Sequence, residues 1–270
     1  MLKTMKVVVL TILVLLFAGL FLLASPDYRE DFAKTLPLKA GETFALDNVN
    51  GKVTVATWKE SKVEIKAVKV ARDDEKDLKD VEIRVEASAG IVSVKAIWPK
   101  NRHDFHVNVD FDIKVPEGVH LKTIETVNGD VEVTGTFASG ELETTNGSVT
   151  AEGVKGPLDV STTNGGIKVG RQEGKLTAET TNGSIRLEQV TFKDGLRAET
   201  TNGSITLAIQ APGEINANLL AETTNGHISV DFPVTLKNLR QSKHMVEAQI
   251  GQGGPEISLH TTNGSITITK

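Results

Sequence analysis

Acidic side chains recur at one position of a repeated motif, and they are the first candidates for a functional site. Three residues before the asparagine of a recurring Asn-Gly pair stand, in order, Glu125, Glu143, Ser161, Glu179, Glu199, Glu222 and His260. If the fold stacks these positions, the row could bind divalent cations or a basic partner. We interpret it as a solvated outer face, because Lys168 and Arg186 stand nearby and charged rows usually serve solubility.

A second group has side-chain types that metals use, namely His103, Asp104, His106, Asn108 and Asp110. On an extended strand, alternate residues from His106 to Asp112 share the face opposite the apolar residues between them. No ligand spacing specific to zinc is present. We therefore interpret the group as the polar side of an amphipathic strand, and we predict no metal site and no cofactor.

The composition of the chain and the spacing of its acids do not favour an enzyme. Glycan hydrolases and lyases need paired carboxylates or a basic group held in a groove, whereas the acids here recur with the repeat. One tyrosine and two tryptophans leave few platforms for sugar stacking, and the absence of cysteine excludes thiol nucleophiles and disulfides. A formal charge of −5 over 270 residues argues against nucleic acid as a partner. We predict no catalytic residue and no enzyme activity.

The acidic row is predicted to lie on strands that flank the Asn-Gly pairs. Counted from Asn128, the intervals between successive pairs are 18, 18, 18, 20, 23 and 38 residues. Apolar residues alternate on both sides of each pair, which is typical of strands with one buried face. Leu46–Val53 is a degenerate first copy. The predicted structural ladder consists of Asn128, Gly129, Asn146, Gly147, Asn164, Gly165, Asn182, Gly183, Asn202, Gly203, Asn225, Gly226, Asn263 and Gly264, with Thr144, Thr162, Thr180, Thr200, Thr223 and Thr261.

Two all-β architectures fit this pattern. In a β-meander of long hairpins, each Asn-Gly is a hairpin turn. In a single-stranded β-solenoid, each copy is one coil, and successive copies lie directly on one another. The solenoid is favoured, because stacking explains a threonine two residues before each asparagine through ladders of identical Thr and Asn side chains. We expect asparagine and glycine to supply positive φ at the bend, and we expect residues 231–255 to cap the open end.

The N-terminus carries an export signal. Lys3 and Lys6 precede an uncharged stretch, Val7–Ala24, and acidic residues follow it, which places the start of the chain in the cytoplasm. We predict an uncleaved signal-anchor in residues 1–25, and the alternative is a signal peptide cleaved before Ser25. Residues 26–115 then form an N-terminal β region continuous with the solenoid, and residues 116–270 form the repeat solenoid. Both the signal-anchor and the cleaved signal peptide predict an extracytoplasmic protein. It is tethered to the membrane by residues 7–24 if the segment stays uncleaved.

The layout resembles a bacterial family of candidate adhesins of unknown function that carry β-strand repeats behind an export signal. The matching text is Val49–Val53, Trp58, Phe111–Gly118 and Ile257–Ile266, together with the Thr-Thr-Asn-Gly copies. The resemblance implies a right-handed β-solenoid at the cell envelope and carries no catalytic residues.

Three functions remain open at this point. The first is a non-enzymatic envelope protein that presents a repetitive surface for adhesion, scaffolding or partner binding, with an envelope protein or a surface glycan as partner. The second is an accessory protein in envelope stress or signalling. The third is a glycan-active β-helix enzyme, whose active site would be an irregularity of the repeat.

Overall fold

The computed structural model describes residues 27–99, 106–191, 193–209, 216–231 and 236–269. These residues are almost entirely β-strand, with one short helix, α1 (Lys76–Asp80). The predicted export segment, residues 7–24, lies outside the described residues, as do His103 and Asp104. Within the described ranges, no helix combines the length and the apolar character that a membrane crossing requires.

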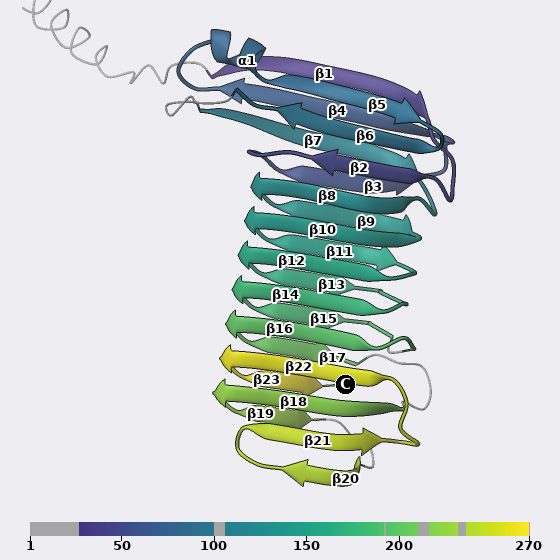
Figure 1. Cartoon of the computed structure of the whole chain (residues 1–270), viewed down its shortest axis with the longest axis vertical. Coiled ribbons are helices and arrows are strands. Elements are labelled where there is room, and N and C mark those ends of the chain that lie inside the picture. The colour runs from purple at the N-terminus through teal and green to yellow at the C-terminus, as the bar shows by residue number, and fades with distance from the viewer. Residues whose placement is uncertain (1–26, 100–105, 192, 210–215, 232–235, 270) are drawn as a thin grey trace, which may run out of the picture.

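The strands form two long sheets that face each other across the core (Figure 1). From the N-terminal end of the stack, sheet A contains β1 (Tyr28–Pro37), β4 (Lys62–Ala71), β7 (Val107–Pro116), β3 (Val53–Trp58), β9 (Val131–Phe137), β11 (Val149–Val154), β13 (Ile167–Gly170), β15 (Ile185–Glu188), β17 (Ile205–Ala208), β23 (Ile266–Thr269) and β19 (Ile228–Asp231). In the same direction, sheet B contains β5 (Glu82–Ser88), β6 (Ile91–Ile97), β2 (Thr43–Asp47), β8 (His120–Asn128), β10 (Ser139–Asn146), β12 (Leu158–Asn164), β14 (Leu176–Asn182), β16 (Leu196–Asn202), β22 (Glu256–Asn263), β18 (Ala217–Asn225), β21 (Met245–Ile250) and β20 (Leu236–Gln241).

Each copy of the repeat is one coil of a solenoid. A coil runs along a strand of sheet B, turns at Asn-Gly and returns along a strand of sheet A. Neighbouring coils pair in parallel, with Leu158 opposite Leu176 and Asn164 opposite Asn182. Parallel pairing of equivalent residues excludes the β-meander for the repeats. The right-handed sense of the coil stays a prediction.

Strands of a sheet lie about 4.8 Å apart. The 12 strands of sheet B therefore span roughly 55 Å from one end of the stack to the other.

The core lies between the sheets and repeats from coil to coil. In the coil of β14 and β15, Leu176, Ala178, Ile185 and Leu187 are at most 1% exposed. These are the alternating apolar positions on both sides of Asn182. The change of strand at the turn explains why the alternation shifts by one residue across Asn-Gly.

The order of coils in space differs from their order in the chain near the C-terminus. The last coil, β22 and β23, lies between the coil of β16 and β17 and the coil of β18 and β19. Successive copies therefore stack directly from Asn128 to Asn202, as expected, but the expectation is wrong for the copies of Asn225 and Asn263. Both neighbours of the last coil carry the same pattern, so sequence periodicity alone gives no preference for either order.

Antiparallel strands end both sheets at the N-terminal end of the stack, and they end sheet B at its C-terminal end, where sheet A ends on the parallel strand β19. At the N-terminal end, β5 pairs with β6, and β1 and β4 extend sheet A. At the C-terminal end, β20 and β21 form a hairpin on the edge of β18, so the described residues 236–255 lie at the end of sheet B that we expected them to cap. The outer strand β20 carries a register shift between Lys237 and Arg240 and a positive φ at Asn238, which are features that discourage pairing with another sheet.

Candidate functional site

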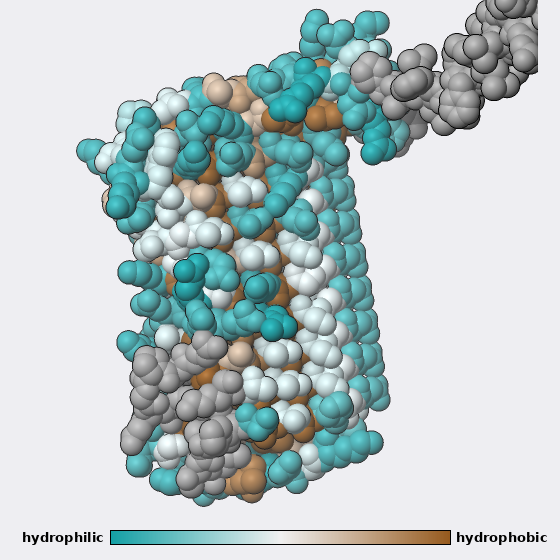
Figure 2. All heavy atoms as spheres, turned by 180° about the vertical axis from the view of Figure 1, so that it is seen from behind, coloured by the Kyte–Doolittle hydropathy of each residue, from teal (hydrophilic) through white to brown (hydrophobic). Residues whose placement is uncertain are grey.

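The asparagines of the repeat form one continuous ladder along a corner of the solenoid. Each side-chain Nδ2 donates to the Oδ1 of the asparagine one coil closer to the N-terminal end, at 2.7–2.9 Å. In spatial order the ladder is Asn50, Asn128, Asn146, Asn164, Asn182, Asn202, Asn263 and Asn225. Seen from behind in Figure 2, a straight hydrophilic column runs along the edge at which these strands of sheet B end.

The threonines two residues before the asparagines bond to the backbone and not to one another. Thr162 Oγ1 donates to the carbonyl oxygen of Gly147 at 2.9 Å, and Thr180 repeats the contact with Gly165 at 3.0 Å. The threonine ladder that stacking led us to expect is therefore a set of cross-coil bonds to glycine carbonyls. In the first copy Asn48 stands at this position, and its Nδ2 donates to the carbonyl of Val109 at 2.9 Å.

The repeat needs its glycines for close approach of the backbone, not for positive φ. Along the ladder, positive φ occurs at Gly51 but at no other glycine or asparagine of an Asn-Gly pair. A Cβ atom on Gly165 would instead lie 1.8 Å from the carbonyl oxygen of Gly147, and one on Gly183 would lie 1.8 Å from that of Gly165. Our expectation about φ is thus wrong for these turns, because the glycine backbones stack directly on each other.

The Thr162 hydroxyl should contribute measurably to stability. We expect Thr162→Val to lower the free energy of unfolding by about 1–2 kcal/mol, because the valine leaves the Gly147 carbonyl without this donor in a nearly buried place. Thermal unfolding followed by circular dichroism measures the change. Thr163→Val is the matched control, since Thr163 is exposed on the opposite side of the same strand. Equal effects at both positions would contradict the assigned role of the hydroxyl.

The acidic positions do form a row on the outer face of sheet B, but the inserted coil changes its order. In register, the row is Lys95, Asp47, Glu125, Glu143, Ser161, Glu179, Glu199, His260 and Glu222. His260 thus separates two glutamates that the sequence alone would place side by side. The structure brings all the predicted positions together and adds Asp47 from the degenerate first copy and Lys95 from β6, a strand that carries no copy of the repeat.

Basic side chains offset part of this acidic charge. Arg197 lies 2.7 Å from a carboxylate oxygen of Glu199 and 3.6 Å from one of Glu179, and Lys95 pairs with Asp47. These contacts lie on an exposed face, where single ion pairs contribute little to stability. A shallow hollow of about 370 Å³ lies over the row between Ser161 and His260.

Glu143 differs electrostatically from its neighbours. Burial raises the pKa of its carboxyl group, and the nearby carboxylates of Glu141 and Glu125 raise it further. The folded protein therefore holds this proton more tightly than the unfolded chain does. Stability is lost as the pH rises from the ordinary glutamate pKa of about 4.3 through the raised pKa of the folded state.

Removing this charge should stabilise the protein near neutral pH. We expect Glu143→Gln to raise the melting temperature at pH 7, and we expect the gain to vanish below about pH 4, where Glu143 is protonated in both states. Melting curves recorded across this pH range measure the effect. Glu199→Gln is the control and should give no gain, because Glu199 pairs with Arg197. A gain from Glu143→Gln that persists unchanged at low pH would exclude this explanation.

The group around His106 occupies the polar side of a strand, as interpreted from the sequence. Asn108, Asp110 and Asp112 are exposed on β7, opposite buried residues. His106 Nδ1 lies 2.7 Å from Asp73 Oδ2, and Asp110 Oδ1 accepts a bond from the backbone N–H of Lys52. Among the described residues, no group of three or more histidines and acids has the geometry of a metal site.

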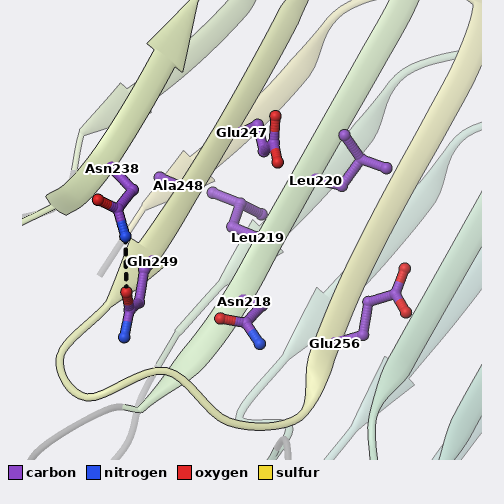
Figure 3. Close-up of a pocket in the computed structure, with 8 residues that line it drawn as sticks. All are labelled: Asn218, Leu219, Leu220, Asn238, Glu247, Ala248, Gln249 and Glu256. Atoms are coloured by element: carbon purple, nitrogen blue, oxygen red, sulfur yellow. Dashed lines mark hydrogen bonds between the residues drawn. The ribbon is translucent and has the colours of Figure 1, made fainter.

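A second hollow lies at the C-terminal end of the stack, and no pattern in the sequence predicts it. It measures about 360 Å³ and lies over β18, β21 and β20, with Asn218, Asn238 and Gln249 around it (Figure 3). Asn238 Nδ2 donates to Gln249 Oε1 at 3.0 Å. No motif marks these residues, because only the folding of the hairpin onto β18 brings them together.

The stacked coils with a hydrogen-bonded corner define a two-sheet β-solenoid. The chain belongs to the Toastrack DUF4097 family, whose profile matches residues 33–269. This assignment agrees with the resemblance drawn from the repeat text, and it covers most of the chain. Among curated proteins, the comparison found no match.

The comparison with solved structures found several that are similar to this chain over most of its length. A candidate cell adhesion protein from Clostridium sporogenes is 13% identical, with 89% of this chain and 99% of that chain covered and a TM-score of 0.38. A candidate adhesin from Bacteroides fragilis is 14% identical, with 88% and 97% covered and a TM-score of 0.43. A candidate lipid-binding protein from Parabacteroides distasonis is 14% identical, with 89% and 97% covered and a TM-score of 0.34.

Proposed function

We propose that the protein is a non-enzymatic, adhesin-like component of the cell envelope that presents the outer face of sheet B to an envelope protein or a surface glycan. The observation that carries this proposal is the constant register of outward side chains over successive coils. Equivalent groups recur about every 4.8 Å along the stack. An extended partner with repeated groups can therefore contact several coils at once, and avidity would compensate for weak single contacts.

The place at which the described chain begins supports a binding surface that extends away from the membrane. The described chain enters the fold through β1, which is the outermost strand of sheet A at the N-terminal end. We propose that residues 7–24 direct export and tether the protein at this end. The hairpin of β20 and β21 would then be the part farthest from the membrane, and the row on sheet B would be accessible along the length of the stack.

The arrangement of the acids favours binding over catalysis. In a glycosidase, two carboxylates with different environments flank one bond. Here the carboxylates repeat at one position, and Arg197 bonds to the row between two of them. We therefore propose a binding surface without a single reactive centre.

Site-specific photo-crosslinking in intact cells tests the proposal. A photoreactive residue at Ser161 lies over the hollow on sheet B, and the same residue at Lys168 lies on the outer face of sheet A in the same coil. We expect crosslinking to one envelope component from Ser161, competed by excess unlabelled protein, and little from Lys168. Equal crosslinking from both positions, or recovery of the chain from the cytosol, would contradict the proposal.

A further inference from the structure

The C-terminal coil, defined as residues Glu256–Thr269, fills a slot between two coils that precede it in the chain. The slot is the space between the coil of β16 and β17 on one side and the coil of β18 and β19 on the other. The C-terminal coil pairs in parallel with all four of these strands. Ile257, Leu259, Ile266 and Ile268 fill the core of the slot and are at most 1% exposed. This coil is therefore held on both sides, although it is the last segment of the chain.

The threonine and asparagine hydrogen bonds of the repeat occur on both sides of the slot. Thr261 donates to the carbonyl of Gly203 at 2.8 Å, and Thr223 donates to the carbonyl of Gly264 at 2.8 Å. The asparagine ladder likewise passes from Asn202 through Asn263 to the next coil. These threonine and asparagine bonds belong to the repeat pattern. None of these contacts depends on which copy of the chain supplies the coil.

The C-terminal coil is joined to the preceding hairpin by a glycine-rich hinge, residues 251–255. Gly251, Gly253 and Gly254 have φ values of 61°, 76° and 156°. Residues other than glycine rarely adopt these backbone conformations. The hinge passes the start of β18, because β21 pairs with one edge of β18 and β22 pairs with the other. Five residues reach at most about 17 Å when extended, so an exchanged coil would enter the slot of a copy that lies directly alongside.

We propose that the C-terminal coil is an exchangeable element, and that the partner for the slot is a second copy of this chain. In the exchanged dimer, each chain inserts its own residues 256–269 into the slot of the other. The slot contacts are identical in the closed monomer and in the exchanged dimer, so only the hinge and the protein concentration distinguish the two states. Such exchange is a low-cost route to a dimer. The proposal rests on the fold and is independent of the proposed function.

The absence of cysteine from the chain allows a direct test with two co-expressed, differently tagged full-length copies. One copy carries Glu199→Cys and the other His260→Cys, two positions that are register partners across the slot. Neighbouring strands hold such partners within the Cα distance of 4.4–6.8 Å that disulfides require. The control pair carries Glu143→Cys and Ser161→Cys, which are register partners in coils that follow one another directly.

We expect a covalent heterodimer on non-reducing gels from the Glu199→Cys and His260→Cys pair, at least ten-fold above the control pair. Deleting Gln252 and Gly253 should increase the heterodimer several-fold, because a shorter hinge hinders return of the coil to its own slot. Two results would overturn the proposal. One is a heterodimer yield equal to the control while a single chain with both substitutions closes its internal disulfide. The other is failure of that doubly substituted chain to form any disulfide, within one chain or between two, because then positions 199 and 260 are not partners across the slot.

Discussion

Replacing Gly165 by alanine is expected to lower the melting temperature by about 10 °C, which corresponds to a loss of about 3–5 kcal/mol in the free energy of unfolding. The added Cβ would lie 1.8 Å from the carbonyl oxygen of Gly147. That oxygen belongs to the backbone of the next coil and also accepts the Thr162 hydroxyl. Neither coil can move away without breaking bonds to its other neighbour, so the clash must separate the stack.

The adjacent residue provides the control. A Cβ atom on Gly166 finds its nearest atom, the carbonyl oxygen of Ser184, at 3.3 Å, and other copies of the repeat carry serine at this position. We expect Gly166→Ser to change the melting temperature by less than about 2 °C, as surface substitutions usually do. If both substitutions proved equally mild in thermal unfolding, the glycine backbones would not stack as described.

Truncation of one core residue in the middle of the stack is the second large effect. Ile185 is 1% exposed and lies between Ile167 and Ile205, its partners in the coils on either side. We expect Ile185→Ala to lower the free energy of unfolding by about 2–5 kcal/mol, because the cavity removes contacts to both neighbours and paired strands limit collapse around it. Chemical denaturation monitored by circular dichroism measures this loss.

The next residue along the same strand separates burial from other causes. Arg186 points to solvent and pairs with Glu188 on the same strand. We expect Arg186→Ala to cost no more than about 1 kcal/mol, because exposed ion pairs contribute little. Ile185→Val should cost an intermediate amount of about 0.5–1.5 kcal/mol. A larger loss at Arg186 than at Ile185 would place the core on the wrong face of sheet A.

The repeat predicted the coil and its interior well, for physical reasons. A strand with one buried face must alternate apolar and polar residues, and a coil that passes between two sheets must change phase at the turn. Leu176 and Ile185 lie in the core because of this rule. The recurring asparagines predicted the hydrogen-bonded corner of the solenoid, since identical side chains in register can bond to each other at the spacing of paired strands.

Sequence reasoning failed where several arrangements satisfy the same pattern. Asn225 and Asn263 follow Asn202 in the chain, but any of the three copies can pair with any other, so periodicity does not fix their order. The intervals of 23 residues before Asn225 and 38 residues before Asn263 are longer than the 18 to 20 residues between the earlier pairs, and they are the departures from the period at which the order changes. The N-terminal pairing of β4 with β1 and β7 likewise depends on contacts between distant segments, which no repeat marks.

The glycines and threonines show a second kind of failure. The sequence marks both residue types, but turn conformation and side-chain ladders explain only part of their role. Asn-Gly is common in turns with positive φ, yet Gly165 is required by contact with the coil beside it. Thr162 similarly bonds to a carbonyl oxygen of the neighbouring coil. Such contacts become visible only when the separation of two backbones is known.

The measurement that tests the coil order most directly compares two disulfides within single chains under mild oxidation. One variant carries Glu199→Cys with His260→Cys, and the other carries Glu199→Cys with Glu222→Cys. In the structure, position 260 lies beside position 199. Position 222 lies on the next strand beyond position 260, about 9.6 Å from position 199 and outside disulfide reach. The structure predicts closure of the first pair alone; closure of the second pair alone would mean that the coils stack in chain order and that the last coil is not inserted.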